Sequence, residues 1–96
     1  MIEKVIQHID ANRKASVDRL NEFLRIPSIS TEPERKADTR KGAEWVHRVF
    51  TGCGIKSEII DTAGHPCVLA DSGPAANGGP TLLIYGHYDV QPTGDE

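Results

Sequence analysis

The feature that most constrains this chain is a short apolar run at residues 81–85 (TLLIY), which leads directly into the pentapeptide GHYDV at residues 86–90. An apolar run of this length, bounded by turn residues, predicts a buried strand of an α/β sheet. The functional sites of open α/β sheets lie just beyond the carboxyl ends of such strands. We therefore expect His87 and Asp89 to lie at a functional edge of the sheet.

His87 and Asp89 are separated by one residue, so in an extended chain their side chains point to the same side. Histidine is the commonest metal ligand in proteins, and a nearby carboxylate can accept the second ring N–H and fix the tautomer. A histidine at a strand end can also be a polar residue that bonds a neighbouring loop. The spacing alone leaves both the metal-ligand role and the structural role of His87 open.

Residues 85–92 (YGHYDVQP) resemble the first metal-ligand signature of the carnosinase-like metallopeptidases. This group of di-zinc hydrolases also includes glutamate carboxypeptidases, aminoacylases, acetylornithine deacetylases and succinyl-diaminopimelate desuccinylases. The resemblance extends over nearly the whole chain, through FLRIPSIS at residues 23–30, GAEWV at residues 42–46 and GHP at residues 64–66. The octapeptide is specific, and its two tyrosines and Gln-Pro pair favour the dipeptidase branch over the deacylases.

The resemblance implies the amino-terminal piece of a three-layer α/β/α zinc-exopeptidase-like catalytic domain, built from two helices followed by three strands. It implies that His87 binds one of two zinc ions, with Mn²⁺ or Co²⁺ as alternatives. It also implies that Asp89 is the active-site carboxylate that keeps His87 in its metal-binding tautomer. The remaining ligands and the general base would come from downstream sequence. On this basis we expect residues 1–96 to be an incomplete catalytic domain, inactive alone, from a dipeptidase that cleaves amide bonds of small peptides and that forms a homodimer.

Two other functions stay open. The same metal site would serve an amino-acid N-deacylase or desuccinylase, whose substrate is an acyl-amino acid. Alternatively, the chain is a non-catalytic α/β module in which His87 is structural. Further Asp, Glu and His ligands downstream would support catalysis, and their absence would support a binding or scaffold role.

Composition excludes several classes of partner. The formal net charge is -3 and the pI is about 5.8, which argues against binding to nucleic acids or anionic membranes. No stretch approaches the ~20 apolar residues needed to span a bilayer, and charges near the amino terminus argue against a signal peptide. We therefore expect a cytoplasmic protein in which Cys53 and Cys67 are reduced and half-buried.

Apolar spacing predicts a nearly continuous helix over residues 2–24, or two helices with a break in the polar stretch at residues 11–14. Pro27 ends this helix, because the residue before a proline is disfavoured in the α region. A second helix is expected over residues 35–51 and ends at the glycines that follow. The basic residues along its first turns alternate with acidic ones, which is typical of a solvated face.

Three strands are expected, over residues 55–61, 67–71 and 82–85. The first two strands flank a short turn-rich segment and should form a hairpin. Turn residues at 77–80 separate the second strand from the third.

The other polar residues of interest receive structural interpretations. His8, His47 and His65 are expected at the surface, away from His87. Ser28 and Ser30 lack the glycine-flanked turn of a nucleophilic serine, so we expect them to satisfy backbone groups within their own turn.

Overall fold

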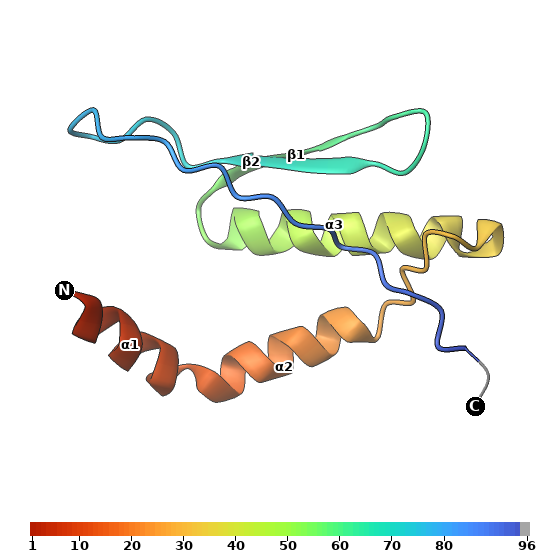
Figure 1. The fold of residues 1–96 in the computed structure, drawn as a ribbon, viewed down its shortest axis with the longest axis horizontal. Coiled ribbons are helices and arrows are strands. Elements are labelled where there is room, and N and C mark those ends of the chain that lie inside the picture. The colour runs from red at the N-terminus through yellow and green to blue at the C-terminus, as the bar shows by residue number, and fades with distance from the viewer. Residues whose placement is uncertain (95–96) are drawn as a thin grey trace.

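The computed structural model describes residues 1–94, and Figure 1 shows how their elements are arranged. In chain order these elements are α1 (Ile2–Ala11), α2 (Arg13–Leu24), the 3-10 turn η1 (Pro33–Arg35), α3 (Lys36–Gly52), β1 (Lys56–Ile60) and β2 (Cys67–Asp71). The β1–β2 hairpin lies against one side of α3, while α1 and α2 extend along the other side (Figure 1). The described chain is therefore a small mixed helix and strand fold, consistent with the α/β class.

The amino-terminal helix is interrupted at a single residue, Asn12, whose backbone angles (φ -108°, ψ 14°) leave the helical region. The side-chain amide of Asn12 donates a 2.8 Å hydrogen bond to the carbonyl of His8, which also accepts the backbone amide of Asn12 at 3.1 Å. Its own carbonyl accepts the amide of Ser16 and starts α2. Of the two predicted alternatives, the structure has two helices with a break in the polar stretch, and the expected end before Pro27 is confirmed.

Neither α1 nor α2 has a buried residue. The apolar stripe of α1 is about half exposed or more, from 51% at Ile6 to 64% at Ile2. The end of α2 does contact α3, because the rings of Phe23 and Trp45 stack with their centroids 4.8 Å apart and Trp45 Nε1 donates to a carboxylate oxygen of Glu22 at 3.0 Å. The contacts of these two helices with the rest of the fold are thus concentrated at the carboxyl end of α2.

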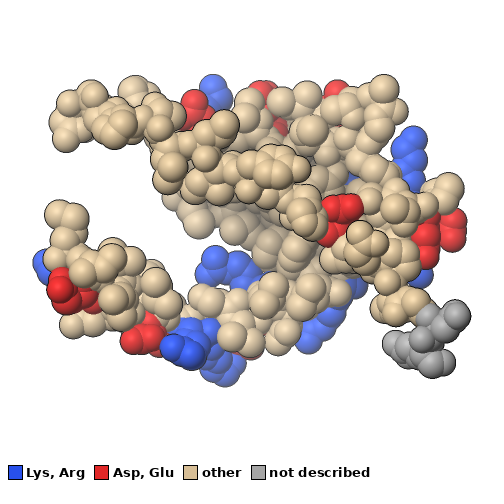
Figure 2. Space-filling view, viewed as in Figure 1, with Lys and Arg blue, Asp and Glu red and all other residues tan. Residues whose placement is uncertain are grey.

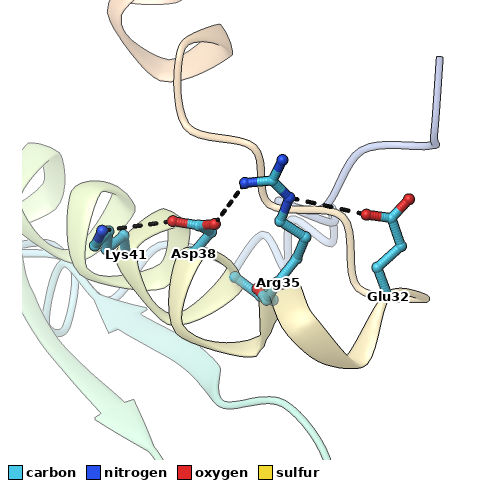
Figure 3. Close-up of polar contacts among 5 residues, drawn as sticks. Glu32, Arg35, Asp38 and Lys41 are labelled. Atoms are coloured by element: carbon cyan, nitrogen blue, oxygen red, sulfur yellow. Dashed lines mark hydrogen bonds and ion pairs between the residues drawn. The ribbon is translucent and has the colours of Figure 1, made fainter.

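A chain of charged side chains, half-buried at Glu32, Arg35 and Asp38 and exposed at Lys41, covers the start of α3 (Figure 3). Arg35 lies between two carboxylates, at 3.1 Å from Asp38 and 3.8 Å from Glu32, and Lys41 contacts the other oxygen of Asp38 at 3.4 Å. The hydrogen bond from Arg35 lowers the pKa of Asp38, while partial desolvation opposes this shift. The predicted solvated face is confirmed, and Arg40 on the same face pairs both with Glu44 of α3 and with Asp61 after β1.

The turn between α3 and β1 contains Gly54 at φ +77°, a left-handed conformation that glycine adopts without strain. The two strands then pair antiparallel, with Lys56 opposite Asp71 and Ile60 opposite Cys67. Alternate residues of each strand are half-buried, among them the opposed pair of Ile59 and Val68. The predicted hairpin is confirmed to within one residue at each end of its strands.

The predicted third strand is wrong for the described chain. Residues 81–85 form no strand with any other part of residues 1–94. The side chains of Leu82, Leu83, Ile84 and Tyr85 are 82–90% exposed. A strand needs a neighbour to pair its backbone groups, and β1 and β2 pair only with each other. The described residues therefore have two of the three expected strands, and their place in a three-layer exopeptidase-like domain stays a prediction.

The prediction that the two cysteines are half-buried is also wrong. Cys53 follows the end of α3, and Cys67 begins β2 on the side of the hairpin that alternation leaves in solvent. Both thiols are exposed and neither forms a disulfide. As for membranes, the helices within residues 1–94 are too short or too polar for any of them to cross a bilayer.

Candidate metal-ligand site

The small residues of α3 provide the surface on which the candidate site is built. Thr39, Gly42 and Ala43 are the buried residues of this helix. A Cβ atom at Gly42 would lie 3.1 Å from the Cβ of Ser28 and 3.2 Å from the Cδ2 of Tyr88. Glycine at this position therefore allows both the loop after α2 and the segment around Tyr88 to approach the helix closely.

Three hydrogen bonds hold residues 88–90 in place. The Tyr88 hydroxyl donates to the carbonyl of Pro66 at 2.6 Å. The Ser28 hydroxyl donates to the carbonyl of Tyr88 at 3.1 Å, and the amide of Val90 donates to the carbonyl of Ser28 at 3.0 Å. Burial raises the pKa of the Tyr88 phenol, consistent with a ring that packs inward. The backbone on both sides of Asp89 is thus fixed against the loop and the hairpin.

The side chains of His87 and Asp89 contact each other directly. Nδ1 of His87 lies 2.8 Å from Oδ1 of Asp89 and 3.3 Å from the Asp89 carbonyl oxygen. A neutral ring that donates from Nδ1 keeps a lone pair on Nε2. The imidazole of His87 is 76% exposed, so this second nitrogen is accessible. The pairing of the two side chains is observed, and the roles assigned to them stay predictions.

The second oxygen of Asp89 also has a partner, because the Ser30 hydroxyl donates to Oδ2 at 2.5 Å. This hydrogen bond lowers the pKa of the Asp89 carboxyl, partial desolvation opposes the shift, and the contact with His87 lowers the pKa further. Asp89 is therefore an ionised acceptor at neutral pH. The expectation that Ser30 satisfies only backbone groups in its own turn is wrong.

His65 contacts the backbone of Ser30. Its Nε2 is 2.8 Å from the carbonyl oxygen of Ser30. A carbonyl can only accept, so Nε2 carries the proton and donates. The other ring nitrogen, Nδ1, is fully buried and has no partner among the described residues. The expected surface location of His65 is thus wrong, and so is that of His47, which is half-buried and contacts Ser57 Oγ at 3.0 Å.

Sequence reasoning missed Ser30 and His65 because their partners lie 59 and 35 residues away. The sole signal was that both residues fall within motifs that contributed to the family resemblance, at residues 23–30 and 64–66. His8 is exposed on α1, as expected.

The described residues fit one ligand of a metal site, with its orienting acceptor. Across residues 1–94 no group of three or more His, Cys, Asp or Glu side chains is placed to hold a metal ion. A catalytic zinc takes about three protein ligands. A hollow of about 640 Å³ lies between the start of α3 and the hairpin turn, and its lining includes Arg40, Asp61 and His65 but not His87. The donor set is therefore consistent with part of a metal centre.

Comparison with known proteins gives an informative match. The chain is similar to the Cys-Gly metallodipeptidase dug1 of Schizosaccharomyces pombe (strain 972 / ATCC 24843), with 32% identity over an alignment of 103 residues. The alignment covers 95% of this chain and 21% of the relative, so the chain spans about a fifth of the length of that protein. No protein-family profile matches the chain, and no solved structure matches it. A similarity of this extent supports a metallodipeptidase-like family and a peptidase-like hydrolase, and nothing more specific.

Proposed function

We propose that this chain is the amino-terminal part of the catalytic domain of a di-zinc dipeptidase, in which His87 binds one metal ion and Asp89 orients it. The full-length protein hydrolyses the amide bond of dipeptides. Cys-Gly, the dipeptide in the name of the similar yeast protein, is the first substrate to test.

One observation carries the proposal: Nδ1 of His87 lies 2.8 Å from a carboxylate oxygen of Asp89. A carboxylate that accepts from one ring nitrogen fixes the tautomer and makes the other nitrogen more basic. This arrangement leaves Nε2 of an exposed ring free to bind a cation. The same two residues lie in the motif YGHYDVQP, which resembles the metal-ligand signature of di-zinc metallopeptidases.

Two bound divalent ions would supply Lewis-acid activation of a water molecule and of the scissile carbonyl. The residues of this chain contribute orientation. Hydrogen bonds lower the pKa of Asp89, so its carboxylate is ionised at neutral pH and accepts a hydrogen bond from the Nδ1–H of His87. Tyr88, anchored to Pro66, keeps this pair at the surface of α3.

The experiment is a metal count on the full-length protein with His87→Ala, and with His8→Ala as the control. His8 is an exposed histidine on α1, so its variant should retain both metal ions and full activity. We expect His87→Ala to lose one metal equivalent and all detectable dipeptidase activity. Two metal ions per chain in the His87→Ala protein would refute the ligand assignment.

Asp89→Ala tests the orienting role separately. Removal of the partner that orients a metal-binding histidine typically lowers metal affinity or activity by about 10–100-fold. We therefore expect a loss of turnover in this range, and chelator competition should show weaker metal binding. Unchanged kinetics in Asp89→Ala would remove Asp89 from the site.

A further inference from the structure

We propose that Ser30 is a positioning residue for Asp89, and that His65 holds Ser30 in place. The resulting series of contacts, His65 to Ser30 to Asp89 to His87, links the hairpin turn to the candidate metal ligand. This inference rests on the proposed function, because it concerns how the ligand is oriented.

The first step is the orientation of the carboxylate. Both oxygens of Asp89 accept hydrogen bonds from side chains, Oδ1 from His87 and Oδ2 from Ser30. A carboxylate with only the first bond can rotate about its terminal torsion, whereas the second bond fixes its plane. Because outer partners of a metal-binding histidine set the direction of its ring, the Ser30 hydroxyl determines where Nε2 of His87 points.

The second step is the position of Ser30 itself. The loop after α2 runs alongside the carboxyl-terminal segment, with a parallel bridge between Ile29 and Val90. The amide of Val90 donates to the carbonyl of Ser28 at 3.0 Å within the same contact. In this parallel register Ser28 is level with Asp89, and the Ser30 hydroxyl reaches Oδ2 of Asp89 diagonally across the two segments at 2.5 Å.

The third step is the contribution of His65. Its Nε2–H donates to the carbonyl of Ser30, and its Nδ1 is buried without a partner among the described residues. In the other tautomer, a buried N–H would lack an acceptor and Nε2 would face the carbonyl oxygen lone pairs. Both effects are unfavourable, so the ring has one tautomer and acts as a fixed donor to the backbone of Ser30. The buried nitrogen is thus consistent with a ring whose position is set by this one contact.

The test uses the full-length protein with Ser30→Ala, Ser30→Thr and a control, Ser16→Ala, on the exposed face of α2. Metal affinity is measured by competition with a chelator, and kcat and KM are measured on a dipeptide. We expect Ser30→Ala to weaken metal binding by about tenfold, at the low end of the range for such partners, and to lower kcat with KM unchanged. Ser30→Thr keeps the hydroxyl and should restore both values, and Ser16→Ala should match the wild type.

A second readout does not depend on metal or activity. Nitrogen NMR of the metal-free protein reports the tautomer of each histidine. We expect His65 to be protonated on Nε2 and His87 on Nδ1, with the Nδ1–H population of His87 reduced in Ser30→Ala. His65→Gln keeps an N–H donor and should preserve the His87 tautomer better than His65→Ala does.

The outcomes separate this inference from the proposed function. If His87→Ala loses a metal ion but Ser30→Ala binds metal like the wild type, the positioning role is refuted and the metal-ligand role stands. If Ser30→Thr fails to restore metal affinity and both Ser30 variants unfold at a lower temperature, Ser30 is structural and the inference is also refuted. If His87→Ala retains both metal ions, the metal-ligand role in the proposed function is refuted, and the positioning role of Ser30 fails with it.

Discussion

The regions with the strongest apolar patterns in this chain are the ones that bury least, whereas the region that packs most tightly is made of small and polar residues. The stripe of α1 and the run at residues 81–85 are mostly exposed. Ser28, Thr39 and Ala43, by contrast, are fully buried around Gly42. Figure 2 shows the exposed segment as an uncharged band over α3, while basic and acidic side chains are mixed along α1 and α2.

The difference teaches that an apolar pattern predicts burial without saying where the burying partner lies. The close contacts of α3 form because Gly42 has no side chain to keep Ser28 and Tyr88 away. The Ser28 hydroxyl then donates a hydrogen bond to the carbonyl of Tyr88. The apolar run at residues 81–85 has no such neighbour within residues 1–94. Small chains bury a limited share of their surface, so one well-packed region accounts for most of the order seen here.

The largest effect should come from filling the space at Gly42. In Gly42→Leu the new Cβ atom would lie within 3.2 Å of side-chain atoms of both Ser28 and Tyr88. Overpacking of this kind typically costs about 1–3 kcal/mol. We expect the segment at residues 88–90 to detach from the helix, and hydrogen exchange of the Val90 amide to accelerate about tenfold or more.

Gly52→Leu is the matched control. Gly52 is in the last turn of the same helix, and a Cβ atom there would meet nothing within 4 Å. The exchange rate of the Val90 amide should therefore stay at the wild-type value. Equal rates in the two leucine variants would mean that α3 does not support the carboxyl-terminal segment in solution.

A smaller effect is expected where α2 meets α3. Stacked aromatic pairs contribute about 0.5–1.5 kcal/mol beyond the area that they bury. A double-mutant cycle with Phe23→Leu and Trp45→Leu, measured by urea unfolding, should give a coupling energy in this range. Asp18→Ala on the exposed face of α2 serves as a control and should show no coupling to Trp45. If the destabilisations of the two single variants simply add up in the double variant, the aromatic contact contributes no coupling, and α2 is as poorly packed as α1.

Local signals in the sequence predicted the elements that depend on near neighbours. The helix limits, the glycine-terminated end of α3 and the β1–β2 hairpin follow from spacing and turn chemistry over a few residues. The strand at residues 82–85 was predicted from the same kind of signal and is wrong, because pairing needs a second strand and no local pattern supplies one. A break at Asn12 was one of two open alternatives, and the side-chain bond of Asn12 to His8 decides it.

The candidate site divides in the same way. The contact between His87 and Asp89 was predictable because it spans two residues in an extended segment. The contacts of Ser30 with Asp89 and of His65 with Ser30 were not, because they depend on how the loop, the hairpin turn and the last segment meet. Residue type also misled, since serine in a turn and histidine beside a proline are common at protein surfaces.

The smallest effect is expected in the exposed run. Leu83 is 87% exposed, so Leu83→Ser in the 96-residue chain should change the free energy of unfolding by less than about 0.5 kcal/mol. Val68→Ser is the matched comparison, because Val68 is a half-buried apolar residue of the paired strand β2 and its loss removes packing in the hairpin. We expect urea unfolding to show a clear destabilisation for Val68→Ser alone. If Leu83→Ser destabilises the chain as much as Val68→Ser does, residues 81–85 are packed in solution, and the contrast between the two regions fails.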